Sequence, residues 1–463
     1  MKINSYGSSK KTRMFLIIFM IFSFCANLYG QANQSLESVL SEAAGLLAKR
    51  DYDSALKLFD NLPPEQAENI QVRIIRASIF NAAGKPADAK RIANAIIAQD
   101  GRNTEALMIL ADAAAVENKE RERRQFLERV LGINAAHTRA LNDLANINLK
   151  NQNLRGAATY FDRALAAEPD NGEALVGRAS VHRYNREFRN AERLLNRAIN
   201  LFPQWAGPLH ERARLYKGAG YYGDALEDFK AAIAIEPDNY WALVDYGQTL
   251  MEINRKQEAV EIFNRAIAAD PNIFMAYVYS AALKDEAGDY AGAEQDYIRL
   301  TRLKPDYYFG FEALGIIRMR NKQWALARDA FLDAYRQAPR EFSYALLAAM
   351  NWMRAGRSTD PRQFLAQVLR TAPRDTIEHS MLRLYHDLRG DENLIPVIDR
   401  ERNVHTKSRM LFYLASYYDV QGLRNLADRY YLMVQELDAA GTVEWMLNEM
   451  ILKERGIGLR KDQ

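Results

Sequence analysis

The chain has 463 residues, of which 48% are hydrophobic and 26% are charged, and its formal net charge is +3. The first thirty residues contain no acidic side chain but hold four basic ones, Lys2, Lys10, Lys11 and Arg13, so the remainder of the chain is close to neutral. This balance gives no electrostatic basis for binding nucleic acid, because proteins of that class concentrate Lys and Arg far more heavily.

The basic N-terminal residues precede a short apolar run over residues 14–24, MFLIIFMIFSF. At about 1.5 Å per helical residue, this run is too short to cross a hydrocarbon layer of ~30 Å. A charged head, a short apolar stretch and small residues after it are typical of an export signal. We therefore predict a cleaved signal peptide over residues 1–32, with an uncleaved N-terminal membrane anchor as the alternative.

Cys25, inside this segment, is the only cysteine of the chain. Lipid attachment at Cys25 is a weaker alternative, because the residue before it is Phe24 rather than a small one. Cleavage would leave a chain without any thiol, so we expect no disulfide, no thiolate metal ligand and no cysteine nucleophile.

Beyond residue 137 the sequence repeats itself every 34 residues. The period is clearest in the prolines Pro169, Pro203, Pro237, Pro271, Pro305, Pro339 and Pro373. The same step relates a column of small residues (Ala145, Ala179, Ala213, Gly247, Ala281, Gly315, Ala349), a column of alanines (Ala157 to Ala327) and a column of large side chains (Phe161, Leu195, Phe229, Phe263, Tyr297, Phe331, Leu365). Self-similarity at a fixed period of this length indicates a stacked array.

Each period predicts two helices joined by a tight turn. Apolar residues recur at steps of three and four between the prolines, and each proline ends a second helix. Glycines midway, such as Gly220 and Gly288, suit a chain that leaves a helix with positive φ. The small and alanine columns allow the two helices to approach closely, and the large column fills the space between neighbouring units. One hairpin cannot bury its apolar face alone, so stacking is required.

This pattern of small, alanine, aromatic and proline positions resembles the tetratricopeptide repeat family from Arg139 to Pro373. The resemblance implies an all-α fold, a right-handed α-solenoid of about twelve 34-residue helix-turn-helix repeats. We expect divergent units over 33–137, a regular array over 138–373, divergent units over 374–440, and a capping helix and tail over 441–463.

The sequence offers no catalytic or metal-binding motif. The six histidines show no metal-ligand spacing, and neither a glycine-rich phosphate loop nor a GxSxG elbow is present. We therefore expect a non-enzyme without cofactor, catalytic residue or bound metal.

In the resembling family, repeat positions 2, 5, 9, 12 and 13 commonly face the concave groove. With the small column as position 8, the candidate partner-binding residues form a polar set, Arg139, Asn142, Asn146, Lys150, Arg183 and Arg214, and an apolar set, Trp241, Met251, Met275, Phe309, Met319, Met350 and Met353. An exposed apolar stripe suggests a partner, and methionine suits adaptable recognition. The alternative interpretation is packing between repeats, with the C-terminal helix folded back over the stripe.

One subgroup of the family clamps a peptide's terminal carboxylate with Lys and Asn at set places in three successive repeats. Asn142 and Asn146 occupy the places where that clamp needs Lys and then Asn, and Gly177 stands where the next repeat needs Asn. We therefore do not expect this clamp here.

The predicted function is a non-catalytic scaffold that binds a protein or peptide in its groove, exported to a periplasm or secreted. The resemblance implies duties in envelope assembly, secretion or motility. The alternatives are a recognition subunit of an envelope enzyme complex and a structural element anchored in the inner membrane.

Overall fold

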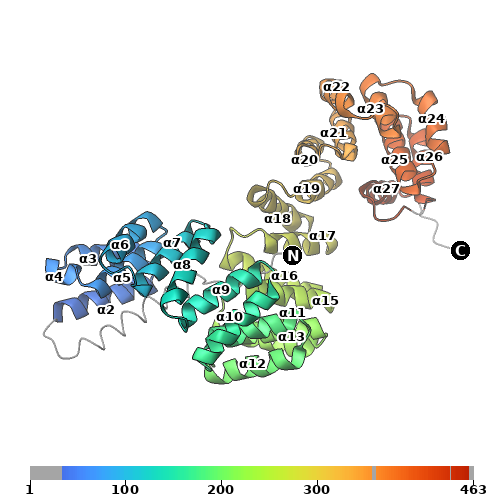
Figure 1. The fold of residues 1–463 in the computed structure, drawn as a ribbon. Coiled ribbons are helices and arrows are strands. Elements are labelled where there is room, and N and C mark those ends of the chain that lie inside the picture. Colours follow the sequence, from blue (N-terminus) through green and yellow to red (C-terminus); the bar gives the residue numbers. More distant parts are fainter. Residues whose placement is uncertain (1–33, 357–360, 438, 458–463) are drawn as a thin grey trace. The chain divides into compact units, whose positions relative to one another are not determined.

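The computed structural model describes residues 34–356, 361–437 and 439–457. Over these ranges the chain forms 26 helices and no strand (Figure 1). The expected all-α fold is therefore confirmed. The predicted signal segment, residues 1–32, lies outside the described residues.

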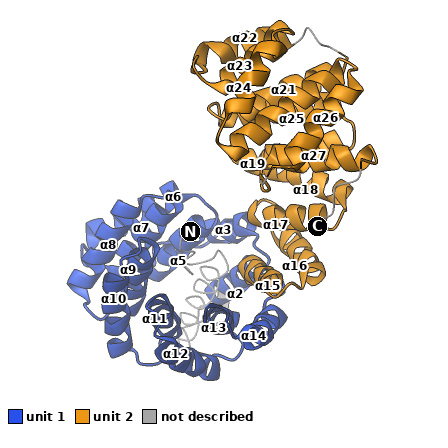
Figure 2. Ribbon diagram, turned by 90° about the vertical axis from the view of Figure 1, so that its right-hand side faces the viewer, with its two compact units in different colours: residues 1–237 blue, residues 238–463 orange. Residues whose placement is uncertain are grey.

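The chain divides into two compact units, Met1–Pro237 and Asp238–Gln463 (Figure 2). The helices of unit 1 are α2 (Gln34–Ala48), α3 (Tyr52–Asp60), α4 (Pro64–Ala67), α5 (Ile70–Ala82), α6 (Pro86–Gln99), α7 (Thr104–Val116), α8 (Glu120–Ile133), α9 (Thr138–Lys150), α10 (Leu154–Ala167), α11 (Gly172–Tyr184), α12 (Phe188–Leu201), α13 (Ala206–Ala219) and α14 (Tyr222–Ile235). The helices of unit 2 are α15 (Tyr240–Glu252), α16 (Lys256–Ala269), α17 (Met275–Glu286), α18 (Tyr290–Leu303), α19 (Tyr308–Arg320), α20 (Trp324–Gln337), α21 (Phe342–Arg354), α22 (Pro361–Thr371), α23 (Ile377–Asp387), α24 (Asp391–Arg400), α25 (Val404–Val420), α26 (Arg424–Gln435) and α27 (Val443–Glu454).

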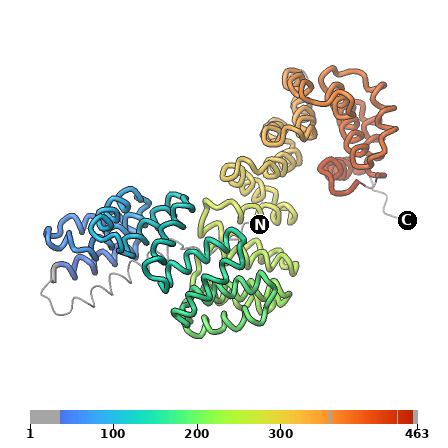
Figure 3. Tube along the Cα trace, in the orientation of Figure 1, coloured from blue at the N-terminus to red at the C-terminus, as the bar shows by residue number. Residues whose placement is uncertain are grey.

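These helices pair into hairpins, as the 34-residue period predicts. The hairpins are α2/α3 and the eleven consecutive pairs from α5/α6 to α25/α26, which agrees with the expected number of about twelve. Within each unit, most helices pack against the helices before and after them in the chain, so hairpins stack in sequence order (Figure 3). Each unit is thus a stack of helical hairpins, and the right-handed sense of the array stays a prediction.

The loop that recurs after the second helix of a repeat contains the residue that ends this helix and the residue that caps the N-terminus of the next one. In the segment EPDN the second helix α10 ends before Pro169, and Asn171 caps α11 by accepting a hydrogen bond from the Ala174 amide at 3.0 Å. Asn103 and Asn239 cap α7 and α15 in the same way. Such a side-chain cap contributes about 1 kcal/mol to helix stability, because it satisfies an amide that has no partner within the helix.

The turn between the two helices of a repeat uses one residue with left-handed φ. Gly84, Gly220, Gly288 and Gly356 have φ between 75° and 84°, as the sequence predicts. The intervening repeats place non-glycine residues at the same position and in the same conformation, namely Arg50, Asn118, Gln152, Arg186, Asn254 and Lys322. The turn geometry therefore belongs to the fold, and glycine is only the residue that adopts it with least strain.

The columns of small and large residues are packed as expected. Phe263 of α16 lies so close to Gly247 of α15 that a Cβ on the glycine would stand 2.7 Å from the ring, and Phe331 and Gly315 repeat this approach at 2.6 Å. The Phe263 ring also stacks on Tyr279 of the next repeat, with centroids 5.1 Å apart. One aromatic side chain thus joins the two helices of its own hairpin and the hairpin that follows, and burial of such a ring contributes about 1.5–3 kcal/mol.

The last helices of unit 2 pack back on earlier ones. Helix α25 contacts both α21 and α23, and α27 contacts both α25 and α26. Tyr413 of α25 donates to the Ser343 carbonyl at 3.2 Å and to the Glu444 carboxylate at 2.6 Å, which ties α21, α25 and α27 together. This arrangement buries part of the first-helix surface of unit 2.

Candidate functional site

The candidate site is the surface of the first helices that carries repeat positions 2, 5, 9, 12 and 13, which we call the first-helix face. In unit 1, α9, α11 and α13 lie along the inner side of the arc of hairpins, and α10, α12 and α14 lie along its outer side (Figure 2). Because α11 also contacts both α9 and α13, side chains of successive repeats can meet on this face.

On α9 the predicted polar residues are bound to neighbouring first helices. Arg139 donates to Asp112 of α7 at 2.6 Å. The amides of Asn142 and Asn146 donate to the Glu173 carboxylate of α11, at 3.4 and 3.0 Å, and Asn142 also donates to Asn171 at 2.9 Å. Both asparagines are buried. Their contact with a partner stays a prediction, and their amide donors already serve the stacking of the repeats.

Lys150 at the end of α9 is the most open member of the polar set. Its side chain is exposed, and its ammonium lies 3.2 Å from the Glu120 carboxylate of α8. Such an exposed ion pair contributes little to stability, so its groups can exchange partners at small cost.

Arg183 and Arg214 meet at one carboxylate, that of Glu211. Arg183 of α11 donates to Glu211 at 2.7 Å, Arg214 donates to it at 3.1 Å, and the Ser180 hydroxyl donates at 2.8 Å. Glu211 is fully buried. Burial by itself would raise the pKa of this carboxyl, but the two guanidinium groups and the hydrogen bonds outweigh it and lower the pKa of Glu211 to about 2.

The sequence analysis missed Glu211, although a signal was present. Glu211 stands three residues before Arg214, so both lie on one face of α13. What the sequence alone could not show is that Arg183, on the preceding first helix, reaches the same carboxylate.

In unit 2 the apolar set divides according to its place in the repeat. Trp241, Met275 and Phe309 all occupy position 2, in the first turns of α15, α17 and α19. Trp241 is 36% exposed, Phe309 is 49% exposed and Met275 is half-buried. Trp241 packs edge-on against Tyr240 with centroids 5.1 Å apart, and Phe309 lies 4.2 Å from the Tyr308 ring, so neighbouring aromatic rings hold these side chains at the surface.

The remaining methionines are less accessible than the sequence suggests. Met251 is half-buried at the end of α15. Met319, Met350 and Met353 are 1%, 0% and 3% exposed and belong to one hydrophobic core with residues of α25 and α27. The expectation of an exposed apolar stripe is wrong at these three positions, because the C-terminal helices of unit 2 cover them.

The described residues form neither a candidate metal site nor a candidate membrane span. No three His, Cys, Asp or Glu side chains within residues 34–356, 361–437 and 439–457 are placed to hold a metal ion. Among the helices of these ranges, none has the length and apolarity needed to span a bilayer.

Comparison with known proteins identifies the repeats. Two family models described as "Tetratricopeptide repeat" match this chain, one at residues 217–284 and the other at residues 142–206 and 281–342. A search among proteins of curated function found no match.

Several solved structures are similar to part of the chain. A tetratricopeptide repeat protein from Parabacteroides merdae is 19% identical, with a TM-score of 0.44, over 54% of this chain and 99% of its own. The type IV pilus biogenesis factor PilW is 19% identical, with a TM-score of 0.41, over 46% of this chain and 98% of its own. PilF of Pseudomonas aeruginosa is 18% identical, with a TM-score of 0.39, over 44% of this chain and 92% of its own.

Proposed function

From the tetratricopeptide repeats matched at residues 142–206 and 217–342, we propose that this chain is a non-catalytic scaffold that binds a protein or peptide on its first-helix face. The observation that carries this proposal is the row formed by Trp241, Met275 and Phe309. These side chains occupy the same position in three consecutive repeats, and all three reach the surface.

A row of this kind suits recognition of a chain segment. Aromatic side chains bury a large area and lose little conformational freedom on binding, which is why tryptophan and tyrosine dominate the energetics of many interfaces. Trp241 packs against Tyr240 and Phe309 packs against Tyr308 in the free protein. These two side chains therefore lose little conformational entropy when a partner binds. We assign most of the binding free energy to these positions.

The polar residues of unit 1 have a different part in the proposal. Arg183 and Arg214 are engaged by the buried Glu211, and Asn142 and Asn146 are engaged by Glu173. A partner that took these donors would have to replace existing hydrogen bonds, so its net gain would be small. In this proposal they hold the face rigid, and they set the partner's orientation rather than its affinity.

We further propose that the scaffold works in a bacterial envelope, as part of envelope assembly, secretion or motility machinery. The support is the N-terminal sequence over residues 1–32, whose charges, apolar run and small residues are typical of an export signal. The mass of the mature N-terminus tests the location. A cleaved chain found in the periplasm or the medium agrees with the proposal, and an intact N-terminus in the membrane fraction supports the anchored alternative instead.

Site-directed crosslinking in the source cell tests the binding face. We place a photoreactive amino acid at Trp241 or at Phe309, and as a control at Leu326, which is also exposed but lies on the second helix α20. The proposal predicts that one protein is captured from both first-helix positions and not from Leu326. Capture from Leu326 alone would show that the binding face has been misplaced.

A further inference from the structure

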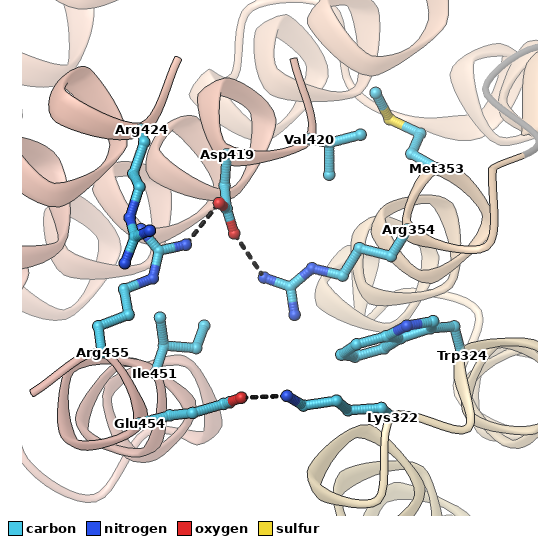
Figure 4. A pocket seen from close by; sticks show the side chains of 10 residues that line it. All are labelled: Lys322, Trp324, Met353, Arg354, Asp419, Val420, Arg424, Ile451, Glu454 and Arg455. Carbon is cyan, nitrogen blue, oxygen red and sulfur yellow. Dashed lines mark hydrogen bonds and ion pairs between the residues drawn. The ribbon is translucent and has the colours of Figure 1, made fainter. Parts of the chain in front are cut away.

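Unit 2 contains a polar cavity that lies outside the row of Trp241, Met275 and Phe309. It lies where the turn between α19 and α20 and the end of α21 meet the last helices, and its volume is about 510 Å³ (Figure 4). A cavity of this size can hold a small ligand or a few residues of a peptide. Lys322, Arg354, Arg424 and Arg455 bring four positive charges to its wall, and Asp419 and Glu454 bring two negative ones.

The internal ion pairs do not use all of this positive charge. Arg455 is bound by Asp419 on one side and by the neighbouring Asp428 on the other, and Lys322 is paired with Glu454. In the part of the chain that the structure describes, Arg424 has no hydrogen bond or ion pair, and it is exposed. With Asp428 included, the cavity still carries one positive charge more than negative.

Arg354 is bound only loosely. One of its terminal nitrogens, Nη2, lies 3.4 Å from Asp419 and 3.4 Å from the Tyr431 hydroxyl, which is long for a charge-assisted hydrogen bond. Nε and Nη1 have no acceptor within the described residues. The guanidinium lies 5.2 Å from the centre of the Trp324 ring and faces the cavity between Trp324 and Asp419 (Figure 4).

This environment favours an added anion. The Arg354 side chain is only 11% exposed, and its Nε and Nη1, which have no protein acceptor, still reach the solvent of the cavity, where an anion can approach them. An arginine in this state gains more from a carboxylate than a fully solvated arginine does, and its planar group can hold both oxygens. The Trp324 ring fixes the plane in which that group is presented.

We infer that this cavity binds a carboxylate presented by a peptide, either an acidic side chain or a chain terminus, with Arg354 and Arg424 as the receiving residues. A surplus of one positive charge matches one carboxylate. A phosphate dianion would exceed that surplus and would lie close to Asp419 and Glu454, so phosphate is disfavoured. The site goes beyond the position-2 row of the proposed function. Its wall combines the end of α21, where Met353 and Arg354 occupy repeat positions 12 and 13, with the turn before α20, the end of α25, Arg424 and α27.

The test uses the full chain labelled with 5-fluorotryptophan and ¹⁹F nuclear magnetic resonance. The Trp324 signal is identified by its loss in Trp324→Phe, and the Trp241 signal by its loss in Trp241→Phe. The probes are the acetylated acidic peptide Ala-Ala-Ala-Glu amide, which carries one carboxylate, its uncharged counterpart Ala-Ala-Ala-Gln amide, acetylated Ala-Ala-Ala-Gln with a free C-terminus as a singly charged chain end, and inorganic phosphate. We expect the acidic peptide to shift the Trp324 signal in a saturable way and to leave the Trp241 signal unchanged, so the result is independent of the row of Trp241, Met275 and Phe309.

Variants decide which residues receive the carboxylate. Arg354→Gln should weaken binding about tenfold or more, since a hydrogen bond to a charged group is lost. Because Arg354 is partly buried, the exposed Arg424→Gln provides a second test, with a smaller but measurable weakening. Arg302→Gln, an exposed arginine of α18 outside the cavity, is the matched control and should bind as the unmodified chain does.

Three results would overturn the inference. The first is a Trp324 signal that does not respond to the acidic peptide. The second is an equal response to the uncharged peptide, or a response to phosphate alone. The third is unchanged affinity in both Arg354→Gln and Arg424→Gln.

Discussion

At the scale of single residues, close approach between helices depends on positions where no side chain fits. A Cβ placed on Gly177 of α11 would stand 2.1 Å from the Phe161 ring of the preceding hairpin. This contact also gives a structural reason why the carboxylate clamp of related repeats is not expected here. The clamp needs Asn at this position, and Phe161 already occupies the space.

Gly177→Ala should therefore destabilise unit 1 by about 1–3 kcal/mol, because the added methyl group overpacks the interface between α10 and α11. Gly45→Ala is the matched control. It lies within α2 with nothing inside 4 Å of the new methyl group, and the change should stabilise the unit by about 0.5–1 kcal/mol. Urea unfolding followed by circular dichroism measures both changes, and equal midpoints for the two variants would refute the packing argument.

Glu211 should make the stability of unit 1 depend on pH. Its pKa is lowered to about 2 in the folded chain, from about 4.3 to 4.5 in an unfolded one. The carboxylate therefore contributes stability that is fully present above about pH 4.5 and is lost as the pH falls toward 2, by roughly 3 kcal/mol in total.

Glu211→Gln should lower stability at neutral pH and flatten this dependence. Glu227→Gln, which changes an exposed glutamate of α14, serves as the control and should keep the full dependence. Urea midpoints measured from pH 5 to pH 2 provide the comparison. If the unmodified chain and Glu211→Gln lose stability in parallel over this range, Glu211 is not the group responsible.

At the scale of elements, the turn in the middle of each repeat keeps one conformation whatever residue occupies it. Gln152 has φ 61° at the position where Gly288 has φ 83°. An L-residue in this region is strained by roughly 1–2 kcal/mol, while glycine costs roughly 0.5–1 kcal/mol in lost chain freedom. The strain of the L-residue is larger than the entropic cost of glycine. Replacing a non-glycine turn residue by glycine and replacing a turn glycine by alanine should therefore change stability in opposite directions.

We expect Gln152→Gly to stabilise the α9/α10 hairpin by up to about 1 kcal/mol, and Gly288→Ala to destabilise the α17/α18 hairpin by about 1–2 kcal/mol. Amide hydrogen exchange of the helices on either side of each turn measures these changes. Slower exchange around residue 288 in Gly288→Ala would contradict the assignment of strain.

Elements were predictable from the sequence wherever the 34-residue column pattern holds. The prolines mark the ends of second helices, and the column containing Phe161, Phe263 and Phe331 marks the contacts between helices, because these contacts are local and recur. For Met319 and Met353 the sequence left two interpretations open, an exposed stripe and a stripe covered by the C-terminal helix, and the column pattern did not decide between them. Their burial depends on a core that they share with residues of α25 and α27, and a contact between such distant segments leaves no periodic trace in the sequence.

At the scale of the whole molecule, the candidate site was only partly within reach of sequence analysis. Repeat numbering placed Trp241, Met275 and Phe309 in one row, and the structure leaves all three accessible. The numbering gave no indication that Arg183 of the preceding repeat reaches Glu211, since an ion pair between successive repeats depends on side-chain reach. It also gave no indication of the division at Pro237, which falls within the regular array.

The central claim is that, within each unit, hairpins stack through contacts with their immediate neighbours and so place their first helices on one face. Ala259 of α16 is fully buried, and Ala259→Leu should overpack its hairpin at a cost of about 1–3 kcal/mol. In an array held by neighbour contacts, such damage stays local. Glu261→Leu, at an exposed position of the same helix, controls for the added leucine.

Amide hydrogen exchange of the full chain, resolved by helix, is the most direct measurement of this claim. For Ala259→Leu we predict faster exchange in α15 to α18 and unchanged exchange in α2 to α6, with no change anywhere in Glu261→Leu. Equal acceleration in all helices of Ala259→Leu would mean that the hairpins do not form a stack of neighbour contacts, and it would contradict the account.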